Sequence, residues 1–234
     1  MKFADYGFVA ALAVAVAVPA LAKGAPDTRV LGVGGKPPEG AVVLYDGKNT
    51  DAWSRAWKIE KDKSMLSGGG GDNASKEKFL DGWYHVEWKE PLMADKTGQE
   101  RGNSGVYLQG RYEVQVLDSY GITDPGRGDC GAIYDTAAPL VNACKPPLEW
   151  QAYDIFFKAP RYDADGKKIE NARLTVFQNG ILVQNNTEAP HPTRSATDPE
   201  GQEAGPLVLQ DHGTPVTYRN VWVKPLPLKG AGHY

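Results

Sequence analysis

The sequence is poor in cysteine and carries no surplus of charge of either sign. Its 234 residues include two cysteines, and the basic and acidic side chains balance to a formal net charge of -3. A charge so close to zero gives no reason to expect nucleic acid or an anionic membrane surface as a partner. Long amphipathic helical patterns are also missing, which argues against a helical fold.

A single apolar run stands out, and it lies near the N-terminus. Lys2 precedes the segment FVAALAVAVAVPA, which is too short to span a bilayer comfortably, and ALA at residues 20–22 fits a cleavage site of small residues. We therefore expect a signal peptide at 1–22, cleavage after Ala22 and an exported protein with no membrane span after cleavage. The alternative is an uncleaved anchor. No cysteine follows the apolar run, which argues against a lipoprotein.

The two cysteines, Cys130 and Cys144, are predicted to form a disulfide. An isolated pair in an exported chain usually has this role. The bond would close a short loop and contribute about 2–3 kcal/mol to stability. The alternative, a cysteine-based metal site, lacks other ligands nearby in the sequence.

Glycine, proline and aromatic residues are plentiful and scattered. The 27 glycines and 17 prolines favour many short strands joined by turns. The clearest local pattern is ARLTVFQNGILVQNN at 172–186, in which two β-rich runs flank Asn179-Gly180, a favoured type I′ hairpin turn. We predict an all-β fold, a sandwich of two antiparallel sheets with few short helices. The predicted domain covers 39–228, between an extended arm at 23–38 and a tail at 229–234.

Three predicted strands each carry two polar residues that are two positions apart and so share a face. If these strands lie in one curved sheet, the pairs would cover its concave side. The alternative is that each pair faces solvent, as is ordinary for a half-solvated antiparallel sheet. Imidazole and carboxylate groups are, however, the standard groups for proton transfer, which favours a site. The pairs are His85 with Glu87, Glu113 with Gln115, and Gln210 with His212.

Asp118 breaks this alternation, because it lies five residues after Glu113. A β-bulge would return it to the face of Glu113 and Gln115. The spacing Glu113-x-Gln115-x-x-Asp118 resembles the bulged strand of family-sixteen retaining glucanases, Glu-x-Asp-x-x-Glu, whose outer carboxylates are the nucleophile and the acid/base. Here the central aspartate is lost and the last carboxylate is shortened. Retaining hydrolysis needs a tight carboxylate spacing, so it stays only as one alternative.

A second resemblance covers nearly the whole chain after the signal peptide. The segments are LYDGKNTDAW, HVEW, GNSGVYLQGRYEVQVLDSYG, GAIYD, QNGILVQNN and GPLVLQDHGTPVTYRNVWVKPL. Together they resemble the 3-keto-disaccharide hydrolase domain family. The resemblance implies a concanavalin-like jelly-roll sandwich in an exported bacterial protein, periplasmic or secreted, that takes part in glycoside breakdown. A carbohydrate is the implied partner, and the oligomeric state is left open.

The ketone in such a substrate suggests a route to cleavage. A ketone at C3 makes the C2 proton acidic, so a base can form an enolate; the C1 substituent then departs by elimination, and water adds to the enone. This needs a base, an acid for the leaving oxygen and a stabiliser of the enolate oxygen. No cofactor is certain, although a Ca²⁺ or Mg²⁺ ion on Glu113 and Asp118 would polarise the ketone. The candidates for proton transfer are Glu113, His212, Glu87 and Asp118, with His212 or Glu113 as the base.

Further side chains are candidates for binding the sugar. Trp150 would stack on a sugar ring or pack in the core, and Arg219 would pair with Glu113, Asp118 or substrate. An enzyme acting on 3-keto-glycosides is the first hypothesis. A non-catalytic carbohydrate-binding module and a glucanase-like hydrolase are the alternatives. The predicted substrate-binding residues are His85, Asn103, Gln115, Tyr134, Trp150, Gln210 and Arg219.

Overall fold

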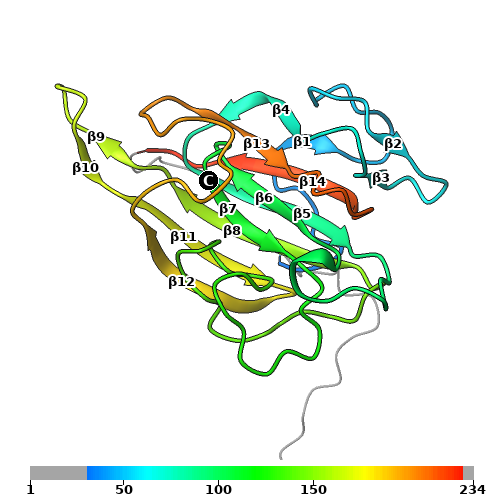
Figure 1. The fold of residues 1–234 in the computed structure, drawn as a ribbon. Coiled ribbons are helices and arrows are strands. Elements are labelled where there is room, and N and C mark those ends of the chain that lie inside the picture. The colour runs from blue at the N-terminus through cyan, green and yellow to red at the C-terminus, as the bar shows by residue number, and fades with distance from the viewer. Residues whose placement is uncertain (1–30, 229–234) are drawn as a thin grey trace, which may run out of the picture.

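The structure is a computed structural model that describes residues 31–228, and it consists of antiparallel β-sheets with almost no helix (Figure 1). The predicted signal peptide at 1–22, the first part of the arm and the tail at 229–234 lie outside the described residues. Across 31–228 no helix has the length and apolar character to cross a membrane.

The larger sheet has eight strands. They follow the order β12-β11-β8-β5-β14-β3-β2, and β1 also pairs with β14. Its strands are β1 (Val42–Tyr45), β2 (Lys58–Ile59), β3 (Met65–Leu66), β5 (Gly82–Lys89), β8 (Gln151–Lys158), β11 (Ala172–Gln178), β12 (Ile181–Ala189) and β14 (Thr217–Pro225).

The smaller sheet has four strands in the order β4-β13-β6-β7. A separate two-stranded ribbon and a single 3₁₀ turn complete the regular structure of the described residues. The strands of the smaller sheet are β4 (Asn73–Phe79), β6 (Ser104–Leu108), β7 (Tyr112–Val116) and β13 (Gly205–Leu209); the ribbon is β9 (Arg161–Tyr162) with β10 (Lys168–Glu170), and the turn is η1 (Gly98–Glu100).

The core lies between the two sheets and follows from strict alternation along the strands. On β5, Val86 and Trp88 are fully buried in the core cluster, and on β7 Val114 and Val116 join the same cluster. The polar residues between them therefore point away from the core. This confirms the predicted all-β sandwich of two antiparallel sheets.

The predicted hairpin at Asn179-Gly180 is confirmed. Strands β11 and β12 pair antiparallel up to Gln178 and Ile181, which flank the two turn residues. Asn179 has φ +55° and Gly180 has φ +81°, the left-handed values that a type I′ turn requires at both positions. The Asn179 side chain also accepts the backbone N–H of Ala152, which ties the turn to the neighbouring strand.

Two expectations were wrong. The three polar pairs do not lie on one sheet, because β5 belongs to the eight-stranded sheet and β7 and β13 to the four-stranded one. The predicted disulfide is absent, because Cys130 and Cys144 are free thiols. Their sulfur atoms and a carboxylate oxygen of Glu90 nevertheless lie within 4.8 Å of one another.

Each thiol also has hydrogen-bond partners of its own. Cys130 Sγ contacts the Tyr153 hydroxyl at 3.2 Å and accepts from Gln178, whereas Cys144 Sγ lies 3.6 Å from the carbonyl oxygen of Leu117. A hydrogen bond with Cys130, together with burial, raises the pKa of the Cys144 thiol well above its usual range. The Cys144 thiol is therefore protonated at neutral pH, a form that reacts slowly.

Candidate functional site

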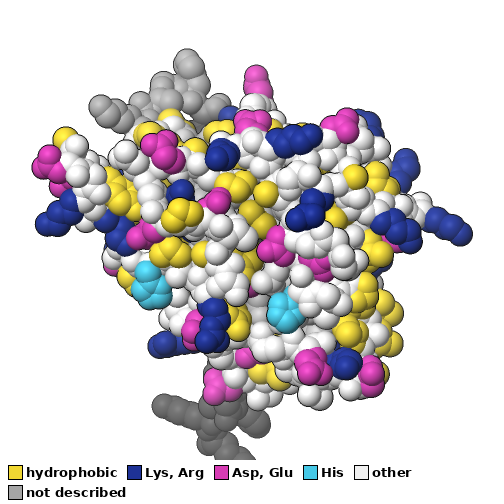
Figure 2. All heavy atoms as spheres, turned by 45° about the horizontal axis from the view of Figure 1, so that its top comes forward, with side chains coloured by type: hydrophobic (Ala, Val, Ile, Leu, Met, Phe, Trp, Pro, Cys, Tyr) yellow, Lys and Arg dark blue, Asp and Glu magenta, His cyan; other side chains and the backbone are white. Residues whose placement is uncertain are grey.

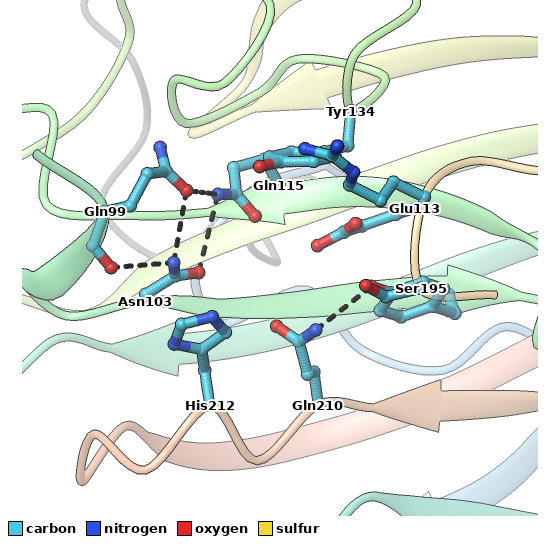
Figure 3. Close-up of a pocket in the computed structure, with 10 residues that line it drawn as sticks. Gln99, Asn103, Glu113, Gln115, Tyr134, Ser195, Gln210 and His212 are labelled. Carbon is cyan, nitrogen blue, oxygen red and sulfur yellow. Dashed lines mark hydrogen bonds between the residues drawn. The ribbon is translucent and has the colours of Figure 1, made fainter. Parts of the chain in front are cut away.

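A polar cavity of about 180 Å³ lies on the outer face of the four-stranded sheet. Glu113 and Gln115 reach into it from β7, and Gln210 and His212 face them from the segment after β13 (Figure 3). On the face of the molecule that Figure 2 shows, basic and acidic side chains are interspersed without a large patch of one sign. The lining residues are Gln99, Asn103, Tyr107, Glu113, Gln115, Tyr134, Arg194, Ser195, Gln210 and His212.

The pairing of β6 with β7 places the central acid of this cavity. Glu113 pairs with Tyr107, and Gln115 with Gly105, across the two strands. Gly105 leaves room for the carboxyl group, since a Cβ there would lie 2.8 Å from Cε2 of Tyr107 and 3.0 Å from Cδ of Glu113. Such distances are shorter than van der Waals contact, so any larger residue at 105 would displace Glu113 or Tyr107.

Glu113 is a buried carboxyl group without a basic partner. It is 3% exposed, and none of the ion pairs within residues 31–228 includes it. Burial raises the pKa of Glu113 to about 8; a hydrogen bond with Tyr107 opposes the rise, and the charge of Asp72 adds to it. Glu113 therefore holds its proton at pH 7, where it can act as a general acid.

Three amide side chains form one wall of the cavity. Asn103 Nδ2 donates to Gln99 Oε1 at 3.1 Å, and Gln115 Nε2 donates to the same oxygen at 3.1 Å (Figure 3). With its amide turned over, Gln115 would instead donate to Glu113 Oε1 at 3.0 Å. These amides offer both donors and acceptors, the complement of sugar hydroxyl groups.

Gln210 presents an unused acceptor on the opposite side. Its Nε2 donates to the Tyr107 hydroxyl at 3.1 Å, whereas its buried Oε1 has no hydrogen-bond partner in the described part of the chain. The backbone N–H of Gln210 donates to Gly105 O at 2.9 Å, which continues the β13–β6 pairing past the end of the strand. A substrate hydroxyl donating to Oε1 would satisfy this atom.

His212 is exposed at the mouth of the cavity, on a segment fixed by its neighbour Asp211. Asp211 Oδ2 accepts the backbone N–H groups of Gly70 and Gly71, each at 2.8 Å, and Asp211 N donates to Asp72. The glycine-rich run therefore anchors the histidine-bearing turn.

The pair His85 and Glu87 lies elsewhere, on the outer face of the larger sheet. Glu87 accepts from Arg219 Nε at 2.7 Å, from Asn220 Nδ2 at 2.8 Å and from the backbone N–H of Gly34 at 2.7 Å. Burial alone would raise the pKa of Glu87, but hydrogen bonds from His85, Asn220, Gly34 and Arg219 together lower it to about 2.

The same cluster binds the arm that precedes the domain. Asp154 accepts the backbone N–H of Gly32 at 2.6 Å and contacts His85 Nδ1 at 2.7 Å. Burial tends to lower the pKa of His85, but its hydrogen bonds to Asp154 and Glu87 raise it above the ordinary value. This cluster is thus an internal ion network that fastens residues 32–35, and it does not open on the cavity.

Three more predicted residues also lie outside the cavity. Arg219 pairs with Glu87 instead of Glu113 or Asp118, and its guanidinium stacks 4.0 Å from the ring centre of Trp150. Asp118 pairs with Arg101 at 3.1 Å. The β6–β7 register runs without a bulge, and β7 ends at Val116, so nothing returns Asp118 to the face of Glu113.

The structure thus brings six predicted residues together and adds four that the sequence patterns missed. Tyr107 had a usable signal, because it lies two positions after Gly105 on a predicted strand and directly opposite Glu113. Gln99 lies in the short turn η1, and Arg194 and Ser195 lie in an irregular segment, so no periodicity indicates a face for any of them. The six are Asn103, Glu113, Gln115, Tyr134, Gln210 and His212.

Comparison with known proteins identifies related chains. A family described as the 3-keto-alpha-glucoside-1,2-lyase-like domain matches residues 40–224. A crystal structure of "a putative glycosyl hydrolase" from Parabacteroides distasonis ATCC 8503 is 39% identical, with a TM-score of 0.73 over 81% of this chain and 85% of that one. Another protein of that organism, described in the same words, is 22% identical, with a TM-score of 0.57 over 81% and 95%, and it shows the fold alone. Among curated proteins, none matches.

Proposed function

The chain belongs to the 3-keto-alpha-glucoside-1,2-lyase-like domain family, and we propose that it is an exported, glycoside-processing enzyme that cleaves 3-keto-glycosides. The observation that carries this proposal is Glu113, a protonated acid that faces His212 across a small polar cavity. Periplasmic or secreted localisation belongs to the same proposal, and it rests on the signal peptide expected at 1–22.

The cavity is suited to a single sugar ring. Its volume of about 180 Å³ lies below the roughly 300–1,000 Å³ of pockets for drug-sized ligands. Its walls are amide, hydroxyl and ionisable groups, which match a ligand that is hydroxylated on every side. The unused Oε1 of Gln210 and the amides of Asn103 and Gln115 would orient the ring hydroxyls.

The raised pKa of Glu113 supports one assignment of the roles that the sequence left open, with Glu113 as the acid and His212 as the base. His212 takes the proton from C2, and the electron pair of that C–H bond forms an enolate with the C3 ketone. The pair then returns and breaks the C1–O bond, while Glu113 gives its proton to the departing oxygen. Addition of water at C1, with return of a proton to C2, completes net hydrolysis and restores both side chains.

The test is turnover of a chromogenic 3-keto-glucoside beside its unoxidised parent. We expect wild type to cleave only the oxidised sugar, and His212→Ala and Glu113→Gln to lose this activity. His191→Ala is the matched control, because His191 is also an exposed loop histidine but does not line the cavity. Equal cleavage of the unoxidised parent would indicate classical glycoside hydrolysis. Sugar binding without cleavage of either compound would indicate a carbohydrate-binding module.

A further inference from the structure

The cavity contains one permanent positive charge, the guanidinium group of Arg194. None of the ion pairs within residues 31–228 includes Arg194. The one carboxyl group in the lining, Glu113, does not neutralise it, because burial keeps that group protonated at pH 7. Among the lining residues, therefore, no carboxylate compensates this cation, which favours a ligand that is, or becomes, negatively charged.

The segment that carries Arg194 is fixed to the strand that carries Glu113. The backbone N–H of Glu113 donates to Thr193 Oγ1 at 3.0 Å, and Thr193 N donates to Arg111 O at 2.9 Å. Arg194 follows directly, so its backbone is positioned relative to the acid by two hydrogen bonds of the preceding residue.

The other end of the segment is held by the turn between β6 and β7. Thr197 N and Asp198 N donate to Gly110 O at 2.8 and 3.1 Å. Gly110 has φ +65°, and a Cβ there would lie 2.6 Å from Thr197 Oγ1 and 2.8 Å from Asp198 Oδ2. The glycine thus permits the close approach that brings residues 194 and 195 to the cavity.

Ser195 adds an independent sign that this position is under functional constraint. Its φ is +63°, in the left-handed region that a non-glycine residue occupies only at a cost of about 1–3 kcal/mol. Such strain persists where surrounding contacts impose it, and here the contacts on both sides of Arg194 and Ser195 do so. Strained residues of this kind concentrate at catalytic and ligand-binding sites.

We propose that Arg194 is a catalytic residue that binds the negatively charged C3 oxygen of the enolate. When the C2–H bond breaks, its proton passes to His212 and its electron pair moves onto the C3 oxygen, which the guanidinium group then stabilises. The charge leaves that oxygen when the C1–O bond breaks and Glu113 protonates the departing oxygen. Arg194 is exposed at the cavity, but a preorganised donor acting on charge that develops during the reaction is worth up to about 100- to 1,000-fold in rate. This inference rests on the proposed cleavage of 3-keto-glycosides.

Two readouts on the same substrate separate this role from a structural one. The first is kcat and KM for the chromogenic 3-keto-glucoside. The second is exchange of its C2 proton in D₂O, which reports enolate formation without C1–O cleavage. For Arg194→Ala we expect kcat and exchange to fall about 100-fold or more, with KM changed little. Arg194→Lys should retain more activity than Arg194→Ala, because it keeps the charge but not the two-pronged geometry.

Control variants assign the loss to a step. Glu113→Gln should lose cleavage but retain exchange, since the acid acts only after the enolate forms. Arg173→Ala should change neither readout, because this half-buried arginine near the start of β11 pairs with Glu188 of β12 and does not line the cavity. Circular dichroism of Arg194→Ala checks that the exposed substitution leaves the fold intact.

The possible failures are distinguishable. If wild type cleaves the oxidised sugar and Arg194→Ala keeps kcat and exchange within about threefold, the role of Arg194 is wrong and the proposed function stands. If wild type neither cleaves the compound nor exchanges its C2 proton, the proposed function is wrong, and the role of Arg194 falls with it.

Discussion

Replacing Glu113 with glutamine should make the protein more stable, and the gain should grow with pH. Burial raises the pKa of Glu113 from 4.5 to about 8, so between these values the folded protein holds a proton that the unfolded chain has released. The free energy of unfolding of wild type therefore falls as pH rises, by up to about 1.4 kcal/mol per pH unit. Glutamine has the shape of the protonated acid and no proton to lose.

The size of the effect follows from the width of this window. The pKa rises by 8 − 4.5 = 3.5. At about 1.4 kcal/mol per unit, the carboxylate destabilises the fold by at most about 5 kcal/mol above pH 8. Local relaxation and water entry reduce such penalties, so we expect a difference of about 3–5 kcal/mol between Glu113→Gln and wild type at pH 8.5. Below pH 4.5 both side chains are neutral, and the difference should vanish.

Urea unfolding followed by tryptophan fluorescence, at pH values from 5 to 9, measures this difference directly. Glu87→Gln is the matched control, because Glu87 is equally buried but its pKa is lowered to about 2. Its carboxylate stabilises the fold above pH 4.5, so Glu87→Gln should be less stable than wild type over the whole measured range, with a deficit that narrows as pH rises because Glu87 also raises the pKa of His85. A Glu113→Gln difference that stays flat from pH 5 to 9 would refute our reasoning, since it would mean that Glu113 ionises normally and cannot be the resident acid.

Three further predictions address the cavity and the thiols. Gly105→Ala should destabilise the fold by about 1–3 kcal/mol in urea unfolding and abolish turnover, because its Cβ would overlap the Glu113 carboxyl group; the same change at Gly201, where a Cβ meets nothing closer than 4.0 Å, should do neither. Cys130 and Cys144 should react slowly with a thiol reagent in the native protein and rapidly in denaturant, in agreement with the raised pKa of Cys144, whereas a denatured chain without titratable thiols would contradict the free-thiol state. Asp118→Asn should have the same turnover as wild type and the same response to EDTA and to added Ca²⁺ or Mg²⁺, because Arg101 holds Asp118 away from the cavity. A lost metal response would instead support the cation site expected from the sequence.

The fold and the facing of side chains could be predicted from the sequence, because both follow from local patterns. Alternation along β7 correctly placed Glu113 and Gln115 opposite Val114, and Asn179-Gly180 correctly marked a hairpin. The partner of each strand is a different matter. β5 pairs with β14, more than 130 residues later, and this pairing carries His85 and Glu87 to the other side of the sandwich from β7. No local pattern encodes such a choice.

The cavity residues that lie in loops could not be predicted from the sequence either, because their positions also depend on contacts with residues far away in the chain. The place of Arg194 depends on hydrogen bonds from residues 193, 197 and 198 to positions 110–113, about 80 residues earlier in the chain. Alternation along a strand indicates which face of the sheet a side chain occupies. The direction of a loop side chain is set only by such distant hydrogen bonds. The prediction for Asp118 was wrong for a related reason, because its return to the face of Glu113 required a bulge that the β6–β7 register does not contain.

Glu87 and Glu113 show why the kind of residue alone could not identify the site. Both are buried glutamates on strands, each beside another polar residue at the same spacing, and the sequence gives no basis for ranking them. Their neighbours separate them. Glu87 is surrounded by donors from Gly34, Arg219 and Asn220, which hold its pKa at about 2. Glu113 has no cation partner among residues 31–228, and its pKa is about 8. Because donors occupy the Glu87 carboxylate, it has neither a proton to give nor a free lone pair for substrate. Its role is to bind the arm at residues 32–35. A solitary buried acid beside an open polar cavity retains its proton, and that proton is what departure of a glycosidic oxygen requires.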